Sequence, residues 1–373
     1  MNASPTSAIG FDLHPREQRV PDEVRDSLLA SPGFGQVFTD HMITLRWSTD
    51  RGWHGGKLEP YGPLVLDPAT AVFHYSQEIF EGLKAYRQDA GPIVAFRPFA
   101  NAARFRRSAA RMAMPELPDD AFVQAIELLV SHDRDWVPAS AEQTLYLRPF
   151  MIATTAALGV GQPAGSYLFL VIASPSGSVF AGGGLRAVSV WLAEGFTRAA
   201  PGGTGEAKTG GNYAASFLGQ QQAIDNGCDQ VVWLDAVEHR WVEEMGGMNL
   251  FFVHGSGQDA RIVTPPLTGT LLPGITRDSL LTLAPDLGIP ASEAPMSVEQ
   301  WRAGCESGEI SEVFACGTAA VITPVAEVKG AMRGGWRIGD GKPGPVTMRL
   351  REQLLGIQFG RLPDPYGWVH KIA

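Results

Sequence analysis

The residue whose type and setting most clearly indicate chemistry is Lys208. The chain contains 24 arginines but only six lysines, and this lysine lies in the segment Pro201–Tyr213, PGGTGEAKTGGNY. The five glycines of that segment allow the backbone to approach a ligand closely. A primary amine in such a loop can attach covalently to an aldehyde cofactor, as the lysines that anchor pyridoxal phosphate do.

Two other interpretations of this loop stay open at this point. Lys208 could be an ordinary solvated residue of a surface loop. The sequence GGTGEAKT also resembles a degraded phosphate-binding P-loop, with Gly202 six residues before Lys208 and Thr209 after it. However, Ala207 stands where that motif has glycine, and the two glycines after Thr209 disfavour the helix that would hold the phosphate.

Pyridoxal phosphate needs three groups besides the lysine, and the rest of the chain must supply them. Its phosphate needs a cradle of cations or N–H groups, its pyridine nitrogen a carboxylate, and its ring hydroxyl a hydrogen-bond donor.

A chain of 373 residues suggests about two domains at roughly 150 residues each. With 45% apolar and 18% charged residues, the composition is that of an ordinary globular protein.

Charge and cysteine content exclude several other classes of protein. The net charge of -9 argues against a nucleic-acid-binding surface or an anionic-membrane partner, so we expect small-molecule ligands. The three cysteines, Cys228, Cys305 and Cys316, form no CxxC, and the eight histidines form no HxxH or HxxxH, so we expect no metal site. The N-terminal residues lack a secretory pattern and no apolar run is long enough to span a bilayer, which predicts a cytoplasmic protein.

Hydrophobic periodicity predicts a mixed α+β or α/β fold. In the first half it predicts strands at Phe38–Trp47, Ala71–Tyr75, Ile93–Phe96, Leu145–Ile152 and Tyr167–Ala173, and helices at Phe99–Met112 and Asp119–His132. In the second half it predicts strands at Arg186–Leu192, Gln230–Asp235, Asn249–Val253 and a pair around Val313–Ile322, and helices at Asn212–Asn226, Asp278–Ala284 and Thr347–Phe359.

A small, Gly-rich and nearly uncharged segment, residues 174–184, indicates a connection between two domains. We therefore expect a small N-terminal α/β domain over residues 1–175 and an interdomain loop over residues 176–186. The larger C-terminal domain, residues 187–373, contains Lys208 and would bind the cofactor if this lysine anchors one.

Six segments, taken in order along the chain, resemble the branched-chain amino-acid aminotransferases. They are FEGLKAYR from Phe80, LYLRP from Leu145, KTGGNYAAS from Lys208, EMGGMNLFF from Glu244, TPPLTGTLLPGITRDSLL from Thr264 and EVFACGTAAVITPV from Glu312. The resemblance covers most of the chain, from about Phe38 to Phe359. It implies the two-domain fold type IV of pyridoxal phosphate enzymes, also called D-amino-acid aminotransferase-like.

The resemblance also implies a role for each cofactor-binding residue. Lys208 matches the catalytic lysine that binds the cofactor and moves a proton, and Tyr213 matches the tyrosine beside the ring oxygen. Glu244, four residues before Met248-Asn249, matches the glutamate at the pyridine nitrogen, with Glu243 as the nearest competitor. The residues that the resemblance assigns to the phosphate are Arg104, Thr270, Leu271, Gly317 and Thr318.

Two observations leave other interpretations of the site residues open. From the residues alone, Arg104, Arg107 and Arg111 could form a solvated basic face of a helix. Gly247 stands where the family commonly has threonine.

The substrate pocket implied by the resemblance combines apolar walls with polar donors, since one site must accept both an aliphatic side chain and the second carboxylate of glutamate. Its residues would be Tyr75, Phe80, Gly82, Tyr146, Arg148, Val160 and Ala319. In the family, several of these reach the neighbouring subunit's site, which implies a homodimer. A CxxC pair of some relatives is replaced here by Ala320 and Thr323, so we expect no thiol switch of that kind.

The expected activity is pyridoxal 5'-phosphate-dependent, reversible transamination of leucine, isoleucine and valine with 2-oxoglutarate. The alternatives with the same fold are a D-amino-acid aminotransferase and an aminodeoxychorismate lyase. A nucleotide-binding ATPase and a non-catalytic binding protein are the alternatives from other classes.

Overall fold

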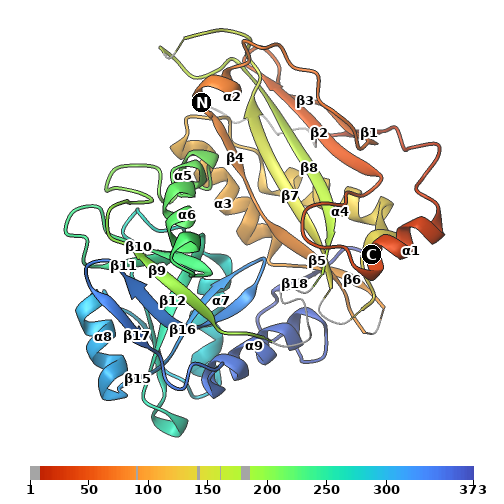
Figure 1. The fold of residues 1–373 in the computed structure, drawn as a ribbon. Coiled ribbons are helices and arrows are strands. Elements are labelled where there is room, and N and C mark those ends of the chain that lie inside the picture. Colours follow the sequence, from red (N-terminus) through yellow and green to blue (C-terminus); the bar gives the residue numbers. More distant parts are fainter. Residues whose placement is uncertain (1–8, 90, 141–142, 160, 178–184) are drawn as a thin grey trace, which may run out of the picture. The chain divides into compact units, whose positions relative to one another are not determined.

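The chain forms two compact units, Met1–Val179 with Ile357–Ala373, and Phe180–Gly356. The computed structural model describes residues 9–89, 91–140, 143–159, 161–177 and 185–373. Within these residues each unit is built around a sheet of nine strands (Figure 1). The expected mixed fold is therefore confirmed.

The first unit has the strand order β1-β3-β2-β8-β7-β5-β6-β18, with β4 paired to β7. Its helices α3 and α4 pack on each other, and the rings of Phe105, Phe122 and Phe169 meet in the core that they form with the sheet. The elements are β1 Phe11–Leu13, α1 Asp22–Ala30, β2 His41–Ser48, β3 Gly52–Pro60, α2 Ala71–Tyr75, β4 Glu78–Phe80, β5 Leu83–Arg87, β6 Ile93–Phe96, α3 Pro98–Arg111, α4 Asp119–His132, β7 Thr144–Ala153, β8 Ser166–Ser176 and β18 Val369–Lys371.

One predicted strand of this unit is wrong. Ala71–Tyr75 forms the short helix α2 and not a strand. Asp67 turns the chain just before it, because its carboxylate accepts a hydrogen bond from the Ala69 N–H and its carbonyl one from the Thr70 hydroxyl. Five residues are too few for periodicity to distinguish the two conformations.

The second unit has the strand order β11-β10-β9-β16-β15-β12-β13-β14, with β17 on β16 and a further pairing of β11 with β12. Its elements are β9 Val188–Ala193, α5 Gly210–Ala214, α6 Phe217–Asp225, β10 Gln230–Leu234, β11 Val242–Met245, β12 Met248–His254, β13 Arg261–Thr264, α7 Ile275–Asp286, β14 Ala291–Glu293, α8 Val298–Ser307, β15 Ile310–Gly317, β16 Val321–Gly330 and β17 Gly334–Arg337. Helix α9, Pro345–Gln358, begins in this unit and ends in the first.

Two boundaries differ from those expected. The predicted helix Asn212–Asn226 is divided into α5 and α6 at Ala215–Ser216. The predicted second domain, residues 187–373, included the C-terminal residues. Residues 357–373 belong instead to the first unit, because β18 pairs with β6. Most of the expected interdomain loop, residues 178–184, lies outside the described residues.

Among the described residues, no helix combines the length and the apolar character needed to cross a bilayer. The same part of the chain holds no group of three or more His, Cys, Asp or Glu side chains arranged for a metal ion.

Candidate active site

Lys208 and Tyr213 lie together in the second unit. Lys208 Nζ donates a hydrogen bond to Tyr213 Oη at 2.8 Å, and the ammonium lies 5.2 Å from the centre of the tyrosine ring. Tyr213 belongs to α5, which follows the loop directly. The buried Asn212 side chain fixes that loop, because it donates to the carbonyls of Thr204 and Ala207.

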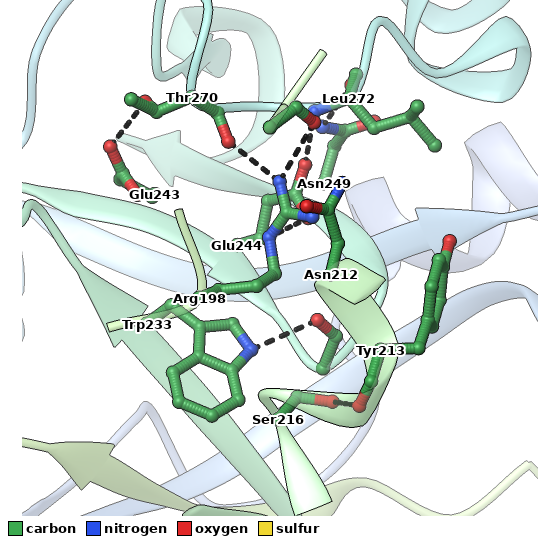
Figure 2. A network of polar contacts seen from close by, with 12 residues as sticks. Arg198, Asn212, Tyr213, Ser216, Trp233, Glu243, Glu244, Asn249, Thr270 and Leu272 are labelled. Atoms are coloured by element: carbon green, nitrogen blue, oxygen red, sulfur yellow. Dashed lines mark hydrogen bonds and ion pairs between the residues drawn. The ribbon is translucent and has the colours of Figure 1, made fainter. Parts of the chain in front are cut away.

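Glu244 lies on β11 and is held by two groups from distant parts of the chain. Arg198 Nε lies 3.1 Å from Glu244 Oε2, and the backbone N–H of Leu272 donates to Glu244 Oε1 at 2.5 Å. The Arg198 guanidinium also donates to the carbonyls of Gly205 and Thr270, at 3.2 and 2.6 Å. Figure 2 shows Arg198 at the centre of this network. Sequence reasoning missed Arg198, since no motif or spacing distinguished it from the other arginines.

Glu243, the competitor of Glu244, has different surroundings. Adjacent residues of a strand point to opposite faces of the sheet. Glu243 accepts a hydrogen bond from the Thr270 hydroxyl and makes no ion pair with Arg198 among the described residues (Figure 2). Burial raises the pKa of the Glu243 carboxyl, and the Thr270 hydrogen bond and the charge of Arg198 oppose that rise.

The glycines around Lys208 permit close packing of backbone against backbone. A Cβ at Gly205 would overlap the Thr270 backbone. The loop and the segment after β13 can therefore approach closely enough for Arg198 to bind carbonyls of both. A Cβ at Gly247, where the family commonly has threonine, would lie 3.3 Å from the Tyr213 ring.

The segment that contains Thr270 and Leu271 leads into helix α7. The side chain of Asn249 donates to the Leu272 carbonyl at 3.0 Å and so ties the segment to β12. Helix α7 begins at Ile275, with Gly274 at its N-cap. A helix N-terminus stabilises an anion placed near it, so this segment suits a phosphate.

Gly317 is the last residue of β15, and Thr318 and Ala319 follow it in the turn to β16, as expected. All three are partly exposed, whereas Cys316 before them is buried and its burial raises the pKa of the thiol. Val321 closes the turn with a φ of 62°. A β-branched residue rarely adopts this conformation, and such strain is concentrated at functional sites.

Four of the expected pocket residues meet in the first unit. Arg148 Nη2 donates to Tyr146 Oη at 3.1 Å, and its guanidinium lies over the ring of Phe80 at 4.9 Å. A Cβ at Gly82 would overlap the Tyr146 hydroxyl, so only glycine fits there. The Phe34 ring, which sequence reasoning missed, packs edge-on against Tyr146 at 5.1 Å.

Tyr75 is not part of this group. It lines a separate cavity of about 730 Å³ together with Gly159 and Gly161. Val160, also expected in the pocket, lies outside the described residues.

Arg104 does not lie on a solvated basic face. Its side chain is buried on α3 and forms a bidentate ion pair with the buried Glu81, at 2.7 and 2.8 Å, whereas Arg107 and Arg111 are exposed. Sequence reasoning missed Glu81, although it lies inside the FEGLKAYR segment.

Comparison with known proteins identifies the class. Residues 78–328 match the amino-transferase class IV family, so the chain belongs to that class. It is 57% identical over 364 residues to the probable branched-chain-amino-acid aminotransferase of Streptomyces coelicolor. The aligned residues cover 97% of this chain and 99% of the relative. It is 56% identical to the branched-chain-amino-acid aminotransferase of Mycolicibacterium smegmatis over 373 residues, the full length of both chains. The protein therefore belongs to the branched-chain-amino-acid aminotransferases and is a transferase.

Solved structures agree with this assignment. The branched-chain amino acid aminotransferase from Escherichia coli matches with a TM-score of 0.70 at 30% identity, covering 88% of this chain and 99% of that one. The T.th. branched-chain amino acid aminotransferase, solved with pyridoxamine 5'-phosphate, matches with a TM-score of 0.72 at 29% identity, covering 88% and 98%. The expected family and fold type IV are confirmed, and the ATPase and non-catalytic alternatives are excluded.

Proposed function

We propose that this chain binds pyridoxal 5'-phosphate on Lys208 and transfers the amino group of leucine, isoleucine or valine to 2-oxoglutarate. The products would be branched-chain 2-oxo acids and glutamate. The observation that carries the proposal is the Lys208–Tyr213 hydrogen bond beside the buried Glu244–Arg198 pair, in a chain of this family. The related structure with pyridoxamine 5'-phosphate supports the choice of cofactor.

The residues of the second unit fit this cofactor. When bound, pyridoxal phosphate supplies a pyridinium ring that withdraws electrons and acidifies the hydrogen on the substrate α-carbon. Lys208 Nζ is the base that moves this proton, and Tyr213 Oη fixes the position of the amine. Glu244 holds a proton at the pyridine nitrogen, and Arg198 together with the Leu272 N–H fixes the orientation of its carboxylate.

The phosphate would be held by Arg104, Thr270, Leu271, Gly317 and Thr318, as the resemblance implies. The Ala319 N–H would bind the substrate α-carboxylate.

The substrate side chain would be held by Phe80, Gly82, Tyr146 and Arg148. Tyr75 and Val160 would reach this pocket from the neighbouring subunit, as the resemblance implies. Arg148 suits a carboxylate, because its Nε has no hydrogen-bond partner among the described residues. The same guanidinium stacks on the Phe80 ring, so an aliphatic chain meets apolar surface beside it. We further propose that the enzyme acts as a cytoplasmic homodimer.

Two separate half-reactions test the proposed activity. The holoenzyme is mixed with leucine, isoleucine, valine or D-alanine, and the absorbance of the bound cofactor is followed. The aminated enzyme is then mixed with 2-oxoglutarate. We expect fast conversion by the three branched-chain substrates and by 2-oxoglutarate, and at least a hundredfold slower conversion by D-alanine. A preference for D-alanine, or no conversion by 2-oxoglutarate, would contradict the proposal.

A further inference from the structure

The second unit contains another cavity, bordered by Glu243 and not by Glu244. Its volume is about 320 Å³, at the lower end of the range of about 300–1,000 Å³ for small-molecule sites. The walls are largely apolar and include Pro201, Trp241, Pro266 and Pro295. The space therefore suits a short hydrophobic group.

Glu243 borders this cavity and carries one acceptor that lacks a hydrogen-bond partner among the described residues. The residue is 5% exposed, and its Oε1 accepts the hydrogen bond from Thr270. Its Oε2 is buried and has no hydrogen-bond partner among the residues that the structure describes. A buried carboxylate oxygen without a donor is unfavourable, so a ligand that supplies a donor gains from filling this position.

The charge around the cavity favours a cation. Asp235 also borders it, and four backbone N–H groups of its own turn lower the pKa of that carboxyl to about 2. No Lys, Arg or His is found among the described residues that line the cavity. The Arg198 guanidinium acts on Glu243 through space but makes its ion pair with Glu244.

We propose that this cavity binds a small molecule that carries a protonated amine on a short apolar group, with the ammonium donating to Glu243 Oε2. The cavity shares Thr270 and Leu271 with the proposed cofactor-phosphate site, but Lys208, Tyr213 and Glu244 are not among its described lining residues. It is connected to that site through Thr270, whose hydroxyl binds Glu243 and whose carbonyl binds Arg198, the ion-pair partner of Glu244 (Figure 2). Binding at Glu243 does not depend on the function proposed for Glu244.

The probe for this site is N,N-dimethylisobutylamine, which is protonated at neutral pH. As a tertiary amine it cannot condense with an aldehyde, so its binding is separate from the chemistry of Lys208. Titration calorimetry with the holoenzyme is expected to show saturable binding of one probe per chain. The Glu243→Gln variant keeps the size of the side chain and an acceptor for Thr270 but loses the charge, and it should bind the probe at least tenfold more weakly.

Two matched variants test whether the cavity itself is occupied. Ala236→Trp adds a large side chain at the cavity wall and should abolish probe binding. Met332→Trp adds the same side chain at a position that is 73% exposed and outside the cavity, and it should leave binding intact. The unchanged cofactor spectrum and thermal unfolding of each variant would show that it is folded and loaded.

Three results would overturn the proposal. The first is no saturable binding at millimolar probe, which would mean that the cavity holds only water. The second is equal affinity in the wild type and Glu243→Gln. The third is loss of probe binding in the presence of saturating 4-methylvaleric acid, which has the carbon skeleton of leucine without the amino group and should occupy the proposed active site. The probe would then be in that site. Failure of the half-reactions would leave the first two measurements readable, because neither depends on the proposed active site.

Discussion

Arg198 and Glu244 form an ion pair in which both side chains are almost fully buried, at 5% and 2% exposure. The arginine comes from the segment after β9 and the glutamate from β11, so the pair joins two parts of the chain. Removing one partner of a buried pair leaves an uncompensated charge, which costs about 3–5 kcal/mol. The pair therefore holds the Glu244 carboxyl group in a fixed orientation away from water.

The two neighbouring glutamates should differ strongly in their effect on the cofactor. Glu244→Gln removes a charged partner of the pyridine nitrogen, and the loss of one such hydrogen bond costs about 1.5–3 kcal/mol. Cofactor affinity, measured by absorbance titration of the apoenzyme, should fall roughly tenfold to a hundredfold. Glu243→Gln should have a far smaller effect. Equal losses would show that the wrong glutamate has been assigned.

The close approach at Gly205 predicts an unusual sensitivity to a single methyl group. Gly205→Ala places a Cβ against the Thr270 backbone, whose carbonyl accepts a hydrogen bond from Arg198. Overpacking of this kind costs about 1–3 kcal/mol, so both the Tm and cofactor affinity should fall. Gly211→Ala is the matched control, because a Cβ at Gly211 would meet no atom within 4 Å. If both variants behave alike, the approach at Gly205 has no energetic importance.

Gly82 should be coupled to the hydroxyl of Tyr146. Gly82→Ala forces that hydroxyl away from its hydrogen bond with Arg148 and should lower kcat/KM at least tenfold. Because Tyr146→Phe removes the overlapping oxygen, the double variant should recover part of the loss relative to Gly82→Ala alone. A double-mutant cycle for leucine measures this coupling. Strictly additive effects would argue that the two residues act independently.

Much of the fold could be predicted from the sequence where a periodic pattern is long. Helices α3 and α4 and strands β7 and β8 lie where periodicity placed them. The five residues of α2 were wrongly predicted, because their conformation depends on the turn at Asp67 and not on any period.

The candidate site could be predicted only where its residues lie in recognisable segments. Lys208, Tyr213 and Glu244 follow from such segments. Arg198 lies outside these segments, and Glu81 was missed although it lies inside FEGLKAYR, because each acts through an ion pair with a residue on a different element. Long-range ion pairs of this kind leave no local signal in a single sequence.

Arg148 should distinguish the two kinds of substrate. Its guanidinium is placed to bind the second carboxylate of glutamate or 2-oxoglutarate, whereas a leucine side chain needs only apolar contact. Arg148→Met should reduce kcat/KM for 2-oxoglutarate roughly tenfold to a hundredfold, corresponding to about 1.5–3 kcal/mol, and affect leucine much less. Separate half-reactions keep the two substrates apart. A matching loss for both would mean that Arg148 supports only the architecture of β7.

The covalent attachment of the cofactor to Lys208 tests the central claim most directly. The holoenzyme is reduced with borohydride, digested and analysed by mass spectrometry. The pyridoxyl phosphate mass should appear on the peptide that contains Lys208. Lys208→Ala should carry no such mass and should have no transaminase activity. Lys57 is exposed, and the Lys57→Ala control should keep both the cofactor label on Lys208 and the activity. A label on another lysine with Lys208 unmodified, or substantial transamination by Lys208→Ala, would contradict the account.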